Sequence, residues 1–224
     1  MAKHKVLIIA AHMDDEVLGC GGIICKHRAA GDNVTVIFVA HRIYNHSFNK
    51  RNYEVEKSHA LKAKKVLGYD EAIFLDLNDE RLDACLQDII IPLEKHVKAM
   101  RPDIVYLPFR QDNNQDHRAV FDASRVALRP AVTPFIKEIN MYEVSSSTEQ
   151  SPQIIETAFL PNFYVNIGPF INKKIEGLAC YETEKRSYPH PRSGKAIKAL
   201  AQKRGTEIGY NYAETFVSIR RKWE

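Results

Sequence analysis

Residues 5–16 read KVLIIAAHMDDE, an apolar run that passes directly into a polar one at His12. The continuous apolar and β-branched segment 5–11 is typical of a strand buried on both faces, as in a parallel sheet. A helical segment is predicted to follow at 16–30, and Gly31 stands where helices commonly end. The stretch therefore indicates a strand, a short polar turn and a helix.

The same alternation continues along the chain. Further strands are expected at 34–39, 72–75, 103–107, 138–144 and 162–167, and helices at 53–67, 82–100, 117–128, 169–181 and 195–204. This order predicts an α/β, Rossmann-like fold with a mostly parallel, doubly wound sheet flanked by helices. Because no repeat or linker interrupts it, we expect a single domain over residues 1–224.

Composition excludes several classes of protein. The net charge of +4 is spread over 224 residues without a basic stripe, so we expect no nucleic-acid partner. The four cysteines lack CxxC spacing and are expected to be reduced. Without a targeting segment or an apolar stretch long enough to span a membrane, the sequence predicts a cytoplasmic protein. The oligomeric state stays open, with a homo-oligomer among the options.

Two polar clusters follow predicted strands, HMDDE at residues 12–16 and DNNQDH at residues 112–117. In open parallel sheets, sites form beyond the carboxyl ends of the strands. If the two strands are neighbours, these clusters face each other across one crevice. Chemistry is therefore expected at this edge of the sheet.

His12 and Asp15 are three residues apart on a tight turn, so both can reach one ion, with His117 joining them from the facing cluster. Imidazole and carboxylate ligands suit Zn²⁺, although another divalent ion stays open, and three protein ligands leave room for water. Asp14 would then act as the base for that water. Asp116 is expected to hold a ligand histidine in the required tautomer.

Two other interpretations compete with the metal site. Acidic residues at a helix start are favoured by capping and by the helix dipole, but this does not explain a histidine at the end of a buried strand. Gly19, Gly21 and Gly22 invite comparison with a dinucleotide-binding turn. The pattern is GxGG rather than GxGxxG and follows an acidic run, so we expect these glycines to allow close helix–sheet packing instead.

The segment AHMDDE, residues 11–16, together with LGCGG, residues 18–22, resembles the AHPDDExLGxGG signature of the LmbE/PIG-L family. Further similarity lies at 66–68, at 112–117, and at 204–216 with its YAETF run. The resemblance covers nearly the whole chain and implies a Zn²⁺-dependent de-N-acetylase of N-acetylglucosamine-type compounds. It implies His12, Asp15 and His117 as ligands and Asp14 as general base.

The chain departs from the family pattern at two positions. Met13 replaces the usual proline, which we expect to change only the stiffness of the turn. Asn114 replaces a histidine that many members carry three residues before the ligand histidine. Its absence puts a separate general acid in doubt and moves more of the proton transfer onto Asp14. The variant DxNxDH is similar to a branch found with bacterial surface-sugar biosynthesis.

Other polar residues are candidates for substrate contacts. Arg42 and Arg51 follow the second strand at the same rim and, with Asn114, are predicted to bind the substrate. His190 and Arg192 lie in a proline-rich turn that could close over the site, with His190 as a catalytic helper and Arg192 as a substrate contact.

The working hypothesis is removal of the acetyl group from an N-acetylated sugar, with a nucleotide sugar or a glycolipid precursor among the candidates. Its competitors are a Rossmann-type nucleotide-binding protein and a non-catalytic metal-binding protein. The sequence names neither the sugar nor the native metal.

Overall fold

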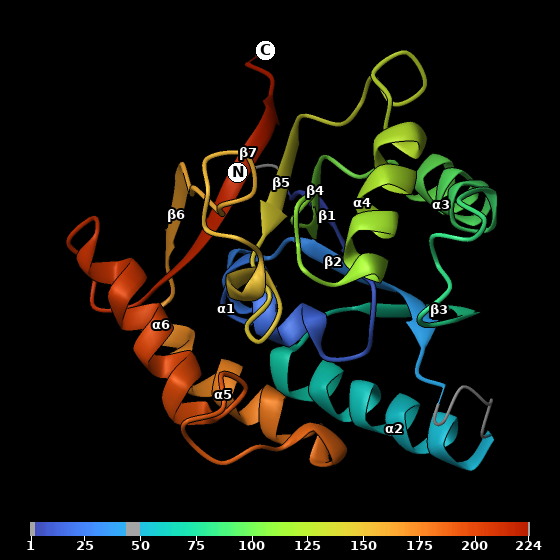
Figure 1. Ribbon diagram of the computed structural model, residues 1–224. Helices are drawn as coiled ribbons and strands as arrows, with labels where there is room; N and C mark the ends of the chain where they lie inside the picture. Colours follow the sequence, from blue (N-terminus) through green and yellow to red (C-terminus); the bar gives the residue numbers. More distant parts are fainter. Residues whose placement is uncertain (1–2, 44–49, 224) are drawn as a thin grey trace.

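The computed structural model describes residues 3–43 and 50–223, and these form a seven-stranded sheet of order β3-β2-β1-β4-β5-β7-β6 (Figure 1). Every neighbouring pair from β3 to β5 is parallel, whereas β7 runs antiparallel to both β5 and β6. The strands are β1 (Lys5–Ala10), β2 (Asn33–His41), β3 (Glu71–Asn78), β4 (Ile104–Pro108), β5 (Glu138–Tyr142), β6 (Phe163–Asn166) and β7 (Ala213–Arg221). The predicted α/β fold with a mostly parallel sheet is confirmed.

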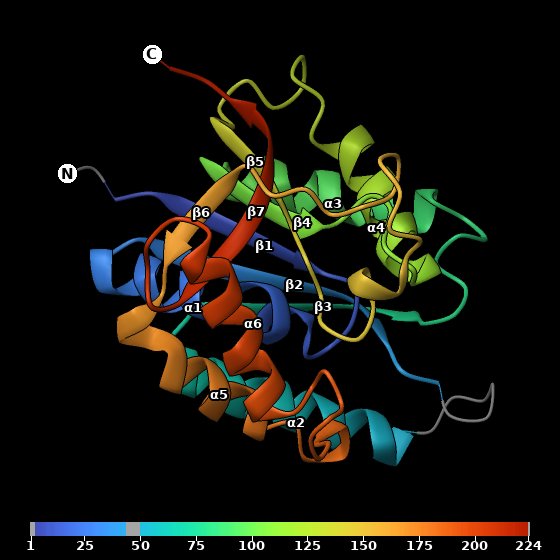
Figure 2. The same ribbon diagram turned by 60° about the vertical axis from the view of Figure 1, so that its left-hand side comes forward.

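Helices cover both faces of this sheet (Figure 2). One face carries α1 (Asp15–Ala30), α2 (Lys50–Leu67), α5 (Ile171–Ala179) and α6 (Gly194–Thr206), and the other carries α3 (Gln87–Met100) and α4 (Gln115–Ala127). Short 3₁₀ turns η1 (Thr148–Gln150), η2 (Gly168–Phe170) and η3 (Glu182–Glu184) join the later elements. None of the described helices has both the length and the apolar character needed to cross a membrane.

Strand β1 has a hydrophobic core on each side. Val6 and Ile8 pack into the core beneath α1, while Leu7 and Ile9 pack into the core beneath α3 and α4. All four side chains are almost fully removed from water. The unbroken apolar run is explained by this two-sided burial.

The glycines of α1 sit against side chains, as their packing interpretation predicted. A Cβ atom at Gly19 would lie 2.2 Å from Tyr142, and one at Gly22 would lie 2.5 Å from Ile167. The same stretch receives a buried ion pair, because Lys174 Nζ donates to the Leu18 carbonyl and to Glu214. The Glu214 carboxylate in turn accepts from the backbone N–H groups of Gly22 and Ile23. These glycines therefore serve close packing in the middle of α1.

The structure differs from the sequence-based expectation in three places. Strand β7 was not predicted, although it lies inside the sheet between β5 and β6. The helix expected over 82–100 begins only at Gln87, because 82–86 form turns. Within the polar loop expected over 41–52, residues 44–49 lie outside the described part of the chain, and α2 already begins at Lys50.

Strands β1 and β4 are neighbours, with Val6 opposite Ile104. The strand order reverses between them, so their carboxyl ends flank the crevice where α/β proteins usually bind ligands. The two polar clusters of the sequence follow these two strands. They therefore meet, as expected.

Candidate active site

Three side chains converge at the carboxyl ends of β1 and β4. One possible ligand atom each from His12, Asp15 and His117 lies within 4.8 Å of the others. The Oδ2 atom of Asp15 is 3.4 Å from His12 Nδ1 and 3.2 Å from His117 Nε2. The backbone N–H of His12 also donates to this oxygen, at 2.8 Å, which fixes the carboxylate within its turn. We refer to these three residues as the metal triad.

The remaining nitrogen of each triad histidine faces a carboxylate. His12 Nε2 is 3.0 Å from Asp116 Oδ2, and His117 Nδ1 is 3.1 Å from Asp112 Oδ1. Such contacts are typical of metal-binding histidines, because they set the tautomer and the orientation of the ring. Asp116 therefore contacts one of the two histidines, and its role in orienting a metal ligand stays a prediction.

Asp112 completes the arrangement and was not assigned a role from the sequence. Its carboxylate accepts hydrogen bonds from the hydroxyls of Ser147 and Thr148 and from the backbone N–H of Asn114. Asp112 thus ties the segment after β5 to His117. The only sequence signal was its place at the start of the second polar cluster.

The donor set fits a divalent cation. Although burial lowers the pKa of His12, hydrogen bonds to Asp116 and Asp15 outweigh it and raise the pKa to about 10. For His117, burial is likewise outweighed by Asp15 and Asp112, and the pKa rises to about 9. The surrounding carboxylates therefore favour positive charge at this point. Two imidazoles and one carboxylate form a zinc-type donor set that leaves a coordination position for water.

Asp14 lies beside the triad in a strained backbone conformation, with φ of 128°. Its side chain makes no capping hydrogen bond to α1, so capping does not account for this residue. Instead, its Oδ2 atom accepts from Arg192 Nη1 at 2.9 Å. Burial raises the pKa of Asp14 to about 6, despite the opposing charge of Arg192. A carboxyl with this pKa suits proton transfer near neutral pH.

Glu184 joins Arg42 and Arg192, two arginines predicted from the sequence to lie at the site. Arg192 Nη1 lies 2.8 Å from Glu184 Oε2, and Arg42 pairs with the other oxygen of the same carboxylate. Arg192 Nε also donates to the hydroxyl of Ser146 at 2.7 Å. The buried Glu184 therefore fixes the guanidinium that holds Asp14. Its sequence signal was weak, because it lies outside both polar clusters.

A polar cleft of about 580 Å³ opens beside His12. Its lining residues are His12, Arg42, Asp79, Glu80, Asn113, Asn114, Gln115 and Asp116. Asn114 also caps α4, because its Oδ1 atom accepts from the backbone N–H of Asp116 at 2.8 Å. The capping role gives a structural reason for asparagine at this position.

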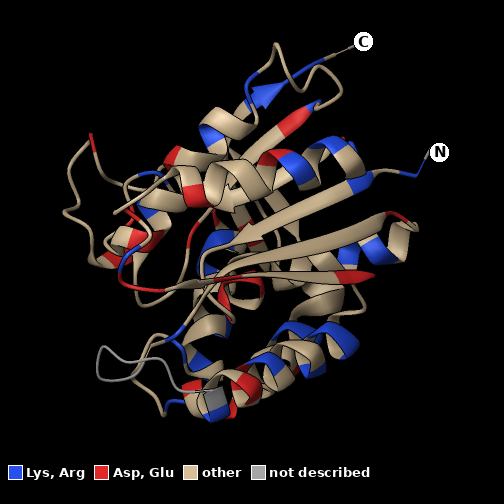
Figure 3. Ribbon diagram, turned by 90° about the vertical axis from the view of Figure 1, so that its right-hand side faces the viewer, with Lys and Arg blue, Asp and Glu red and all other residues tan. Residues whose placement is uncertain are grey.

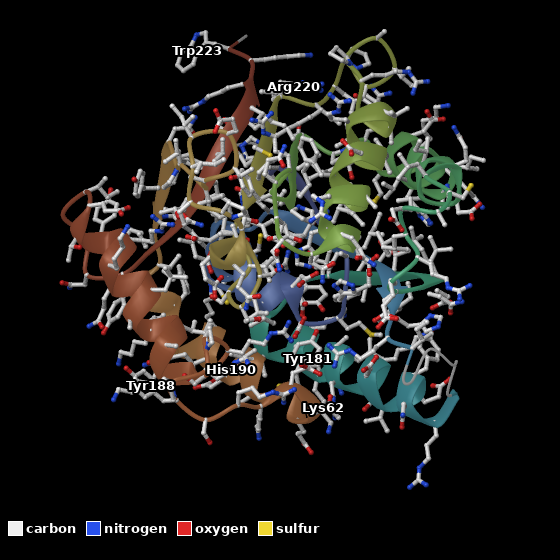
Figure 4. All side chains as sticks on the ribbon, in the orientation of Figure 1. Lys62, Tyr181, Tyr188, His190, Arg220 and Trp223 are labelled. Carbon is white, nitrogen blue, oxygen red and sulfur yellow. The ribbon has the colours of Figure 1, made fainter. Side chains whose placement is uncertain are left out.

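Two predicted site residues lie apart from this arrangement. Arg51 is exposed on the first turn of α2 and does not line the cleft. His190, labelled in Figure 4, lies on the segment between η3 and α6. Its described hydrogen bonds stay within that segment, where its Nδ1 atom accepts from the backbone N–H of Arg192 at 3.1 Å. Functional roles for Arg51 and His190 stay predictions.

Comparison with known proteins shows which protein family the chain matches. The profile of the PIG-L family, described as GlcNAc-PI de-N-acetylase, matches residues 7–128. The Escherichia coli protein YaiS, described as an uncharacterized deacetylase, is 31% identical over 172 residues, which cover 74% of this chain and 88% of YaiS. The profile match includes both polar clusters.

Solved structures share the fold at lower identity. The N,N′-diacetylchitobiose deacetylase of Pyrococcus horikoshii superimposes with a TM-score of 0.77 at 18% identity, covering 97% of this chain and 84% of that one. GalB, a 4-carboxy-2-hydroxymuconate hydratase of Pseudomonas putida, gives 0.74 at 19% identity, covering 98% of each chain. At these identities the likeness concerns the fold alone, and a deacetylase and a hydratase share it. The family match and the YaiS match decide the assignment: the chain belongs to the PIG-L family, whose LmbE-like members include deacetylases.

Proposed function

We propose that this chain is a zinc-dependent hydrolase that removes the acetyl group from an N-acetylated sugar. The main observation behind this proposal is the metal triad, whose possible ligand atoms lie within 4.8 Å of one another. It lies next to the buried Asp14, whose pKa is raised. Membership in the PIG-L family and the deacetylases among its relatives and structural neighbours support the reaction type.

His12, Asp15 and His117 would hold the ion, with Asp116 and Asp112 orienting the two imidazoles. A divalent ion held there would polarise the acetamide carbonyl and make a water molecule acidic enough to lose its proton near neutral pH. Another divalent metal would supply the same chemistry.

Asp14 accepts the proton of the attacking water. Its Oδ2 atom is held by Arg192, and its other oxygen receives no hydrogen bond from any described residue. As the carbon–oxygen bond forms and the carbon–nitrogen bond breaks, Asp14 returns the proton to the nitrogen, which leaves as the free amine. The products are acetate and the deacetylated sugar.

Arg192 and Glu184 keep Asp14 in position for both transfers. Because Arg192 is anchored by Glu184 and by Ser146, its guanidinium cannot turn away without breaking two further contacts. Asn114 stands where many members of the family carry a histidine, and its side chain caps α4, which is consistent with Asp14 serving as both base and acid. His190 stays a predicted helper.

The direct experiment measures acetate released from N-acetylglucosamine and N,N′-diacetylchitobiose, before and after treatment with a chelator. We expect release that stops when the metal is removed and returns when Zn²⁺ is restored. Undiminished release by metal-free protein would refute the proposal. Metal binding without acetate release from any N-acetylated sugar would favour a non-catalytic metal-binding protein.

A further inference from the structure

The first turn of α1 contains a buried carboxylate that the proposed mechanism does not use. Several acidic positions lie at the carboxyl edge of the sheet, on the left in Figure 3, where α1 begins. Glu16 in this turn is fully removed from water, one residue after Asp15 and two after Asp14. A buried carboxylate is costly unless hydrogen bonds satisfy it, so its partners indicate what it does.

The two oxygens of Glu16 have different partners. Oε2 accepts from the backbone N–H of Asp14 at 3.2 Å, and Oε1 accepts from the hydroxyl of Tyr181 at 2.6 Å. The first contact is local and resembles helix capping, whereas the second comes from a residue 165 positions away. Tyr181, labelled in Figure 4, lies between α5 and η3 and is 1% exposed. Capping therefore accounts for only one of these two contacts.

Asp14 needs such support because its backbone is strained. Its φ of 128° is a value that residues other than glycine rarely adopt. Such conformations persist only where the surroundings enforce them. Glu16 restrains this peptide by accepting from its N–H, and the Tyr181 hydroxyl fixes the accepting carboxylate. We infer that Tyr181 is a positioning residue that acts on Asp14 through Glu16. This inference rests on the proposed deacetylase function and identifies what holds its base.

Tyr181 also belongs to the turn that holds the Asp14 side chain. The backbone N–H of Glu184 donates to the Tyr181 carbonyl at 3.0 Å, which closes this turn. Glu184 pairs with Arg192, whose Nη1 atom donates to Asp14 Oδ2. One short segment therefore reaches Asp14 twice, through Glu16 at the backbone and through Arg192 at the carboxylate. A shift of this segment would move the backbone and the side chain of Asp14 together.

The ring of Tyr181 is itself held by packing. It belongs to the hydrophobic core beneath α1 and lies edge-on to the ring of His59, with centroids 6.4 Å apart. Tyr181 is not among the described residues that line the polar cleft beside His12. It can therefore influence the position of the base without contacting a sugar bound in that cleft.

A less firmly held base should slow the chemical step and leave binding intact. Tyr181→Phe keeps the ring and removes only the hydroxyl. We expect kcat to fall by about ten- to a hundredfold, because a small displacement of a positioned group costs that much. KM and zinc affinity should stay those of the wild type, because the change lies outside the cleft and the metal triad.

The test measures kcat, KM and zinc affinity of zinc-loaded full-length variants, with N,N′-diacetylchitobiose as substrate. Glu16→Gln should lower kcat to a similar extent, because one of its two contacts loses the accepting oxygen. Adding Tyr181→Phe to that variant should lower kcat little further, because the two residues act in series.

Tyr106→Phe is the matched control. It removes a similarly buried hydroxyl, which contacts His27 Nε2 at the amino edge of the sheet. This variant should have a lower melting temperature and an unchanged kcat. A purely structural role for Tyr181 would give the same result in Tyr181→Phe, and that result would overturn the inference.

Loss of zinc along with activity in Tyr181→Phe would also overturn the inference, as would additive losses of kcat in the double variant. If wild-type protein releases no acetate while zinc is bound, the deacetylase proposal fails instead. Crystal structures of the zinc-loaded variants then decide the inference separately. An Asp14 that keeps its φ near 128° and its contact with Arg192 in Tyr181→Phe would contradict it. An Asp14 displaced there, but not in Tyr106→Phe, would support it.

Discussion

Two clusters of histidine and aspartate lie at opposite ends of α1. At the amino edge of the sheet, His27 in the last turn of α1 contacts Asp32 through Nδ1 at 2.7 Å and the hydroxyl of Tyr106 through Nε2 at 3.1 Å. At the carboxyl edge, His12 and His117 share one oxygen of Asp15, and each has a further carboxylate on its other nitrogen. Both clusters are mostly buried, so burial alone does not separate them.

Their charge balance does separate them. Burial lowers the pKa of His27, which favours the neutral imidazole, and both its nitrogens have partners within the protein. At the other end, carboxylates outweigh burial and raise the pKa of His12 to about 10 and that of His117 to about 9. A buried histidine–aspartate contact is therefore not a functional signal in itself. Convergence on one point with surplus negative charge indicates a cation site.

The largest contrast should come from removing one histidine from each cluster. His117→Ala should lose the metal and lower acetate release by about a thousandfold, because the metal contributes several kcal/mol to the reaction. His27→Ala should keep both metal and activity while losing stability. Elemental analysis and an acetate assay on the two purified variants measure this difference. Equal metal content in both variants would contradict a metal site at the carboxyl edge alone.

Asp14→Asn separates the base from the ligands. Turnover should fall by about a hundred- to ten-thousandfold, since a positioned general base contributes that much, while the metal content stays that of the wild type. The asparagine retains an oxygen that can accept from Arg192. Loss of the metal along with the activity would instead make Asp14 a ligand.

Replacing a carboxylate that contacts a histidine should weaken metal binding at the carboxyl edge but not at the amino edge. Asp112→Asn and Asp116→Asn should each weaken metal affinity by about ten- to a hundredfold, because the histidine they hold loses its fixed orientation and some of its basicity. Asp32→Asn, the same change at the amino edge, should leave the affinity unchanged. Competition with a chromophoric chelator gives the three dissociation constants, and a shift in Asp32→Asn would show that the clusters are not independent.

The smallest effect concerns stability at the amino edge. Asp32 also accepts from the backbone N–H of His4, and although burial opposes the shift, this bond and His27 hold the pKa of Asp32 below its ordinary value. A lowered native pKa stabilises the fold above the unfolded pKa of about 4, and this contribution disappears as the pH falls through the native value.

Asp32→Asn should therefore lower the free energy of unfolding by about 1–2 kcal/mol at pH 7, and the difference from wild type should shrink toward pH 3. Urea unfolding at the two pH values measures it. A deficit that stays constant with pH would mean that the charge of Asp32 is not what stabilises this end.

The sequence was sufficient to predict the part of the site that depends on local spacing. His12 and Asp15 lie on one turn, and His117 was predicted to join them if its strand lay beside β1, which is the observed pairing. The hydrogen bonds and ion pairs between distant segments could not be predicted from the sequence. Glu184 reaches Asp14 only through Arg192, and Asp112 is held by hydroxyls from the segment after β5.

Strand β7 was missed for a similar reason. Residues 213–221 read AETFVSIRR, whose charged ends hide the alternation, and the segment enters the sheet antiparallel between strands far earlier in the chain. The buried position of Glu214 becomes clear only from its contact with α1, where the backbone N–H groups of Gly22 and Ile23 donate to its carboxylate. Such pairings depend on tertiary contacts, which one-dimensional patterns do not contain.

We propose that amide hydrolysis requires one divalent ion held by His12, Asp15 and His117. The most direct measurement is acetate release from N,N′-diacetylchitobiose as Zn²⁺ is added stepwise to chelator-treated protein. We expect a rate that rises in proportion to added zinc, levels off at about one equivalent per chain, and stays flat in His117→Ala. Full acetate release by the metal-free protein, or an unchanged zinc response in His117→Ala, would contradict it.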